Sequence, residues 1–132
     1  NMKRIGRLIL VFIAIFVFAG IADSGDKKVA SLSKEDAQKK AIGHQTKGNS
    51  FDDEGKFNDA ITEYKESLKY SPDNTDTLFN MGVVYLKANK PGEAVGVFER
   101  LVKITPNDVE AYNLLGIAYR GSGKEDNARK SW

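Results

Sequence analysis

Apolar residues follow two different patterns along this chain. A continuous apolar run without a charged side chain extends from Leu8 to Ala22. From Ala41 onward, apolar residues instead recur three or four positions apart, which is typical of one face of an amphipathic helix. The segment between these regions is polar. The pattern therefore predicts three parts: a leader over residues 1–24, a linker with the start of the first helix over residues 25–40, and a helical array over residues 41–132.

The leader has the composition of an export signal. Basic residues precede its apolar run at Lys3, Arg4 and Arg7. A basic start, a short apolar run and small residues at its exit are typical of a secretory signal peptide, with cleavage after Ser24 or after Ala22. The run is shorter than the roughly 20 residues of an ordinary spanning helix, but a retained membrane anchor over residues 5–22 stays open. In either case we expect the array to be exported, either periplasmic or anchored in the inner membrane with the array outside.

The end of the linker predicts the start of a helix. Ser33 is followed by Glu35 and Asp36. A serine at the N-cap and acidic residues in the first turn both stabilise a helix N-terminus. We therefore expect Ser33 to cap the first helix.

From Ala41 onward the sequence repeats with a period of 34 residues. Six columns share this register: Gly48, Gly82 and Gly116; Phe51, Tyr85 and Tyr119; Gly55, Asn89 and Gly123; Ala60, Ala94 and Ala128; Tyr64, Phe98 and Trp132; and Pro72 and Pro106. A period of this length predicts a solenoid of helix–turn–helix units. The units are residues 41–74, residues 75–108 and an incomplete third unit, residues 109–132.

Each unit is expected to pair two helices. In the middle unit, Leu78, Gly82 and Tyr85 share one face of the first helix, and Phe98 lies on the second. A glycine inside a helix costs about 1 kcal/mol relative to alanine. Its recurrence therefore predicts a close approach of the two helices of one unit.

The residues between helices predict where each helix ends. Gly55, Asn89 and Gly123 tolerate left-handed backbone angles, which suit a helix C-terminus. The prolines of the last column should end the second helices. In the middle unit, Pro91 and Gly92 are expected to extend the break between its helices.

The middle unit resembles the tetratricopeptide repeat (TPR) family. It reads Leu78-x2-Met81-Gly82-x2-Tyr85, then Ala94-x3-Phe98, then Pro106, in the order of large residue, Leu, Gly, Tyr, Ala, Phe and Pro that marks this repeat. The resemblance implies an all-α fold, a TPR-type α-solenoid preceded by an apolar N-terminal helix. It also implies that the first helices line a concave groove that binds peptides. The first unit departs from the pattern at His44 and Lys47.

Composition excludes several kinds of chemistry. The chain has no cysteine and one histidine, which excludes disulfides, thiolate zinc sites, thiol nucleophiles and multi-histidine metal sites. The formal charge of +2 lies wholly in residues 1–24, so residues 25–132 are neutral. Without a basic excess, nucleic-acid binding is disfavoured. We predict no catalytic residues, no cofactor and no metal, and therefore no enzyme.

Two short segments and one histidine resemble parts of functional motifs. Gly121-Ser122-Gly123-Lys124 lacks the Ser/Thr and the preceding strand of a phosphate loop, and is interpreted as a turn between helices. The acidic residues Asp52 to Glu54 lack calcium-loop spacing and are interpreted as a solvated helix end. His44 has no evident partner and is expected to pack at the edge of the first helix.

A second stripe beside the core stripe of the first helices is the candidate binding surface. Its residues are Asn49, Phe79, Asn80, Val83, Asn113, Leu114 and Ile117. The asparagines can hydrogen-bond the backbone of an extended peptide, and the aliphatic residues can form side-chain pockets. The alternative is that Phe79, Val83 and Leu114 only pack on the preceding repeat.

These observations favour a non-catalytic module that binds a protein, a peptide or an assembly partner. Some TPR proteins of similar fold grip the carboxylate tails of cytosolic chaperones with asparagines and basic residues. Here Gln45, Glu110 and Leu114 stand where the resemblance requires basic residues, so we do not expect that role. Two alternatives stay open: a scaffold within a larger envelope enzyme or a secretion or biogenesis complex, with the activity beyond Trp132, and self-association through the third unit.

Overall fold

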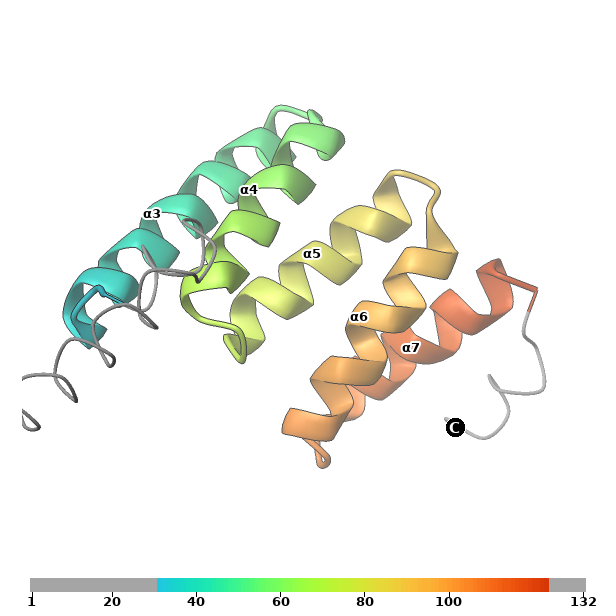
Figure 1. The fold of residues 1–132 in the computed structure, drawn as a ribbon. Coiled ribbons are helices and arrows are strands. Elements are labelled where there is room, and N and C mark those ends of the chain that lie inside the picture. The colour runs from blue at the N-terminus through green and yellow to red at the C-terminus, as the bar shows by residue number, and fades with distance from the viewer. Residues whose placement is uncertain (1–30, 124–132) are drawn as a thin grey trace, which may run out of the picture. The chain divides into compact units, whose positions relative to one another are not determined.

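The structure is a computed structural model that describes residues 31–123. It contains the helices α3 (Lys34–Asp53), α4 (Phe57–Tyr70), α5 (Thr75–Lys87), α6 (Pro91–Ile104) and α7 (Val109–Gly121) (Figure 1). No strand occurs within residues 31–123, and the predicted all-α class is confirmed. Within this part of the chain, no helix combines the length and apolar character needed to cross a bilayer. The predicted leader lies outside the described residues.

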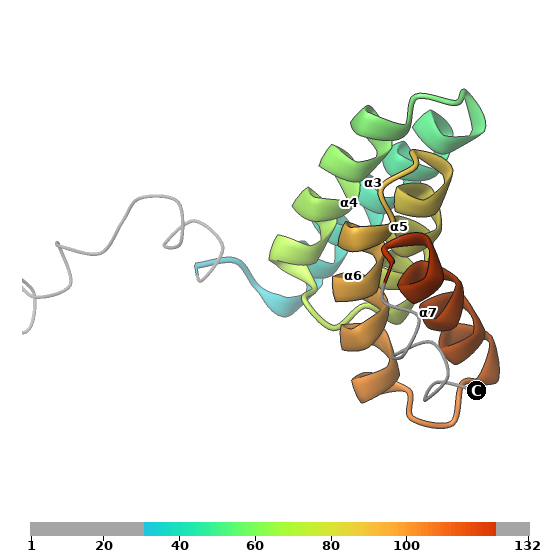
Figure 2. The same ribbon diagram turned by 90° about the vertical axis from the view of Figure 1, so that its right-hand side faces the viewer.

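The helices form two layers, visible in Figure 2. The first helices of the units, α3, α5 and α7, lie on one side, and α4 and α6 lie on the other. Helix α3 packs on α4, and α5 packs on α6, while α4 also contacts α5 and α6 contacts α7. Each helix pair is therefore stacked on the next, which confirms the predicted solenoid. One continuous core runs between the layers and includes Leu78, Val84, Phe98 and Leu101.

The recurring glycines mark the closest approach within a helix pair, as predicted. A Cβ atom on Gly48 would lie 2.6 Å from Cε1 of Tyr64, and a Cβ atom on Gly82 would lie 2.6 Å from Cε1 of Phe98. Both rings are at most 1% exposed. In each pair, the second helix therefore places its aromatic ring directly on the backbone of the first.

The turns between paired helices use the predicted left-handed residues. Gly55, Asn89 and Gly123 have φ angles of +73°, +57° and +80°. At Asn89 the amide donates to the carbonyl of Leu86 (3.1 Å), and the next amide, of Lys90, donates to the carbonyl of Tyr85 (2.8 Å). This bond pair is the Schellman motif, which satisfies carbonyls at a helix C-terminus.

The starts of the helices include one correction to the sequence analysis. Ser33 caps α3 as predicted, because its Oγ accepts from the amide of Asp36 at 3.1 Å. Pro91 and Gly92, however, do not extend the break; they are the first two residues of α6. Proline suits the first helical position, where its missing N–H has no partner to lose and its φ angle is already helical.

Candidate functional site: the α3–α5–α7 face

The seven predicted binding residues all lie in the layer of first helices. Asn49 is on α3, three of the others are on α5, and the remaining three are on α7. Asn49, Asn113 and Ile117 are exposed, and the other four are half-buried. We call this surface the α3–α5–α7 face and define it by the set Asn49, Phe79, Asn80, Val83, Asn113, Leu114 and Ile117.

A hydrogen-bonded pair of asparagines joins α3 to α5 on this face. Nδ2 of Asn80 donates to Oδ1 of Asn49 at 3.1 Å. The same Oδ1 accepts from the hydroxyl of Tyr64 at 2.7 Å. The Tyr64 ring is buried against Gly48, so the core fixes the position of the pair. The amide donors of Asn49 and the amide oxygen of Asn80 remain, which matches the acceptor and donor of a peptide unit.

The apolar members of the face are divided between the core and the solvent. Phe79, Val83 and Leu114 pack against the core, as the packing alternative expects, yet each keeps part of its side chain open to solvent. Ile117 is 44% exposed. The apolar surface on α5 and α7 therefore lies on the same face as the asparagine pair that joins α3 to α5. Asn113, in contrast, makes no side-chain hydrogen bond with another of the described residues.

An ion pair that the sequence analysis missed lies at the other end of the α3–α5 contact. Nζ of Lys87 is 2.9 Å from both carboxylate oxygens of Asp52. Both residues are at the C-terminal ends of their helices, where Lys87 also faces the negative end of the helix dipole. Asp52 is therefore a structural contact between units and not part of a solvated acidic end alone.

A pocket opens between α5 and α7 at the start of both helices. Its volume is about 270 Å³, and its lining consists of Thr75, Asp76, Phe79, Leu101, Thr105, Asp108 and Glu110. We call it the α5–α7 pocket. Oδ1 of Asp108 accepts from the amide of Ala111 at 3.1 Å and thereby caps α7. Of its lining residues, the sequence analysis had singled out only Phe79 and Glu110, since it treated each helix separately.

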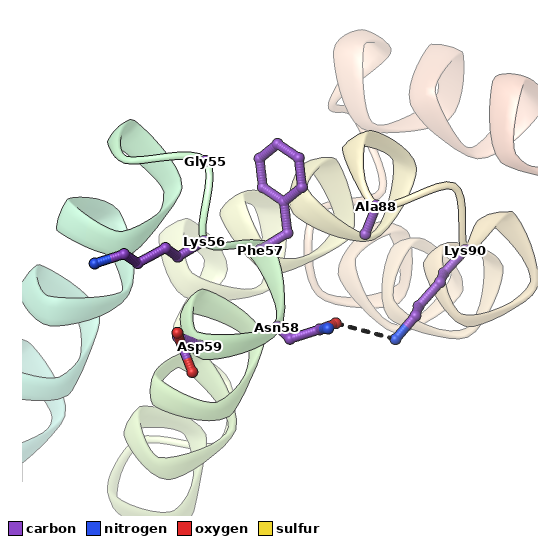
Figure 3. Close-up of a pocket in the computed structure, with 7 residues that line it drawn as sticks. All are labelled: Gly55, Lys56, Phe57, Asn58, Asp59, Ala88 and Lys90. Atoms are coloured by element: carbon purple, nitrogen blue, oxygen red, sulfur yellow. Dashed lines mark hydrogen bonds between the residues drawn. The ribbon is translucent and has the colours of Figure 1, made fainter.

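A second pocket lies at the turns of the first two units (Figure 3). Its volume is about 380 Å³. Nζ of Lys90 donates to Oδ1 of Asn58 at 3.2 Å, and the ring of Phe57 points away from this bond. This hydrogen bond ties the turn after α5 to the first turn of α4.

His44 has a partner that the sequence analysis did not find. Its Nδ1 is 2.7 Å from Oε2 of Glu63, and its ring stacks on Tyr70 with 5.9 Å between centroids. These contacts place His44 between α3 and α4, in agreement with the expected packing role. Within the described residues, no group of three or more His, Cys, Asp or Glu could hold a metal ion.

Two tyrosines have perturbed acidity. Burial, together with the carboxylates of Asp52 and Asp53, raises the pKa of Tyr64 to about 12. Burial also raises the pKa of Tyr119 to about 12, helped by its hydrogen bond to Oε1 of Glu99 at 2.5 Å. Both phenols stay protonated at neutral pH and act as hydrogen-bond donors.

Comparison with known proteins defines the class. The family model described as "Tetratricopeptide repeat" matches residues 53–129, more than half of the chain. This chain belongs to the tetratricopeptide repeat family.

Individual relatives add detail at low identity. Photosystem I assembly protein Ycf3 of Synechococcus sp. (strain CC9605) is 26% identical over 89 residues, which cover 65% of this chain and 51% of that protein. The chain thus spans about half the length of this relative. Among solved structures, the first TPR of Spaghetti (RPAP3) bound to the HSP90 peptide SRMEEVD has a TM-score of 0.66 at 26% identity, covering 71% of this chain and 75% of that one. The second TPR of the same protein, bound to the same peptide, has a TM-score of 0.68 at 26% identity and covers 74% and 90%.

Proposed function

We propose that this chain is a non-catalytic protein-interaction module that binds an extended segment of a partner protein on the α3–α5–α7 face. We also propose that it acts outside the cytoplasmic membrane, with the leader over residues 1–24 either cleaved or retained as an anchor. The basic, apolar and small-residue order of that leader supports export. Mass spectrometry of the N-terminus of the exported protein would distinguish cleavage from retention.

The asparagine pair is the observation on which the binding proposal rests. Tyr64 holds Asn49 and Asn49 holds Asn80 by hydrogen bonds, so the two amides offer a donor and an acceptor side by side. Half-buried Phe79 and Val83 continue along the same helix. Backbone hydrogen bonds plus side-chain pockets are the two components of extended-peptide recognition.

The chaperone tails bound by the structural neighbours are not the ligands we propose. The peptide SRMEEVD in those neighbours has three acidic side chains. Here the places that the resemblance assigns to basic residues hold Gln45, Glu110 and Leu114. A carboxylate of Glu110 would repel such a tail.

A second candidate role is assembly of a membrane-associated complex. The relative from Synechococcus is named for the assembly of photosystem I, and the leader of this chain favours a membrane-proximal location. In this role the α3–α5–α7 face would hold a subunit during assembly, or form a scaffold within a larger complex.

Site-specific photocrosslinking tests the binding proposal. A photoreactive residue at Ile117, which is exposed on the face, should capture a partner in the native host. The same residue at Lys103, exposed on α6 in the other layer, is the matched control and should not. The double substitution Phe79→Ala/Asn80→Ala should remove the Ile117 adduct while circular dichroism shows unchanged helicity. Equal adducts from both positions, or an adduct that survives the double substitution, would contradict the assignment of the face.

A further inference from the structure

We propose that the α5–α7 pocket and the apolar surface next to it select a partner segment that carries a lysine or arginine beside aliphatic side chains. This inference rests on the proposed function and names the chemistry of the segment. It follows from the volume, the lining residues and the charge of one surface.

The pocket is lined by both apolar and acidic side chains, and we call its acidic residues Asp76, Asp108 and Glu110 the rim. Phe79 is half-buried and Leu101 is 1% exposed, and both line the pocket together with Asp76 and Glu110. The stem of a lysine or arginine is aliphatic and packs on apolar side chains such as Phe79 and Leu101, while its charged end stays near the acidic rim. The face of a phenyl ring such as that of Phe79 also attracts a cation. A volume of about 270 Å³ is open to receive this side chain.

The acidic residues of the rim form no ion pair with a basic residue within residues 31–123. Asp76, Asp108 and Glu110 form no ion pair with another described residue. The basic residues of neighbouring elements form no ion pair with these acidic residues: Lys87 pairs with Asp52, and Arg100 pairs with Asp73 at 3.7 Å. Lys103 in the last turn of α6 is exposed and forms no ion pair with another described residue. Arg120 lies in the last turn of α7, at the opposite end from Glu110. A cation supplied by a partner would therefore complement the rim.

The spacing along α5 matches an extended segment. Phe79 and Val83 are separated by one helical turn, a rise of about 6 Å. Side chains two residues apart on an extended strand are about 6.6 Å apart on the same side. A basic side chain in the pocket is therefore expected to place the side chain two residues away over Val83. The amide oxygen of Asn80, on the adjacent side of α5, is then available to the segment's backbone. The recognised pattern is a basic residue followed or preceded, two positions away, by an aliphatic residue.

Two synthetic peptides with blocked ends, SKSVSLS and SESVSLS, test this inference directly. They differ only in the charge of the second residue. Titration into the full 132-residue chain, followed by amide chemical shifts, should give shifts around Phe79 and Glu110 with the lysine peptide. The lysine peptide should bind about tenfold more tightly than the glutamate peptide at low salt, and this ratio should shrink at high salt.

A matched pair of variants separates the rim from net charge. Glu110 and Glu93 both lie in the first turn of a helix, but Glu93 is on α6, in the other layer. Glu110→Gln should reduce the lysine preference to about threefold, and Glu93→Gln should leave it unchanged. Equal reductions in both variants, or equal affinity of both peptides, would overturn the inference.

The outcomes also distinguish this inference from the proposed function. Shifts on the α3–α5–α7 face that are the same for both peptides would overturn the charge selection and leave the face as a peptide site. No shifts on this face with either peptide, together with no partner captured at Ile117, would overturn both.

Discussion

The ring of Phe98 rests directly on the backbone of Gly82, so close that a Cβ atom at this position would lie 2.6 Å from both Cε1 and Cζ of the ring. The ring is fully buried between α5 and α6. It cannot move aside without disturbing the core. Gly48 and Tyr64 have the same relationship, so this contact between glycine and aromatic ring recurs in both complete units.

Gly82→Ala should therefore destabilise the protein despite the better helix propensity of alanine. Alanine normally stabilises a helix interior by about 1 kcal/mol relative to glycine. Overpacking a core costs about 1–3 kcal/mol, so after this gain we expect a net loss of up to about 2 kcal/mol in the free energy of unfolding, measured by urea denaturation.

Gly96→Ala is the matched control for this substitution. Gly96 is also inside a helix, but nothing lies within 4 Å of its expected Cβ position. It should gain about 0.5–1 kcal/mol. If Gly82→Ala also stabilised the protein, the close approach would not be a constraint. The added Phe98→Leu substitution should be less costly in Gly82→Ala than in the original chain, because the two sites are in contact.

Asn89 should tolerate glycine but not alanine. It is the one non-glycine residue with positive φ, +57°, within the described residues. Left-handed backbone costs an L-residue with a Cβ roughly 1–2 kcal/mol, and asparagine is among the few that adopt it readily. Asn89→Ala should lower the melting temperature, whereas Asn89→Gly should change it little. A stable alanine variant would contradict the Schellman geometry at this turn.

Asn74 should contribute to stability as a helix cap. Its Oδ1 accepts from the amide of Thr77 at 3.0 Å at the start of α5. Asn74→Ala should cost about 1 kcal/mol, and Asn74→Asp should retain most of the stability. Lys56 occupies the same position before α4 without a side-chain cap bond, so Lys56→Ala should have a smaller effect. Thermal denaturation of all three variants would measure the difference.

The stability of the protein should fall steeply in alkaline solution. The pKa of Tyr64 is about 12 in the folded chain, against 10.0 for an ordinary tyrosine. Folding therefore favours the neutral phenol, and this contribution is complete below pH 10 and is lost as the pH rises toward 12. Tyr119 acts in the same direction.

The Tyr64→Phe variant tests this pH dependence. It removes the ionisable group, so its free energy of unfolding should decline less between pH 10 and pH 12 than that of the original chain. At neutral pH it should be about 1 kcal/mol less stable, since the hydrogen bond to Asn49 is lost. Parallel declines in both proteins would show that Tyr64 does not titrate with a raised pKa.

The periodic part of the sequence was sufficient to predict the helices and their pairing. The glycine and the aromatic residue, Gly82 and Phe98 in the middle unit, recur at the same spacing as Gly48 and Tyr64 in the first unit. This spacing, combined with the geometry of the helix, was enough to predict that the two helices of a unit approach closely. Pro91 shows the limit of this reasoning, because a proline that begins a helix and a proline that breaks one look alike in sequence.

The contacts between units required the tertiary structure. Asp76 and Glu110 share one register of the repeat, and the pocket brings both to one rim. Asn80, in contrast, bonds to Asn49, 31 positions away, and Lys87 pairs with Asp52, 35 positions away. Neither separation equals the period, since the offset depends on how neighbouring helices cross. The sequence alone thus determined the fold, the left-handed residues at which the first helices of the units end, and the residue types on each face. Only the packing of one helix on another decided which of those residues meet, because side-chain contacts between units depend on the angle and shift of whole helices and not on local pattern.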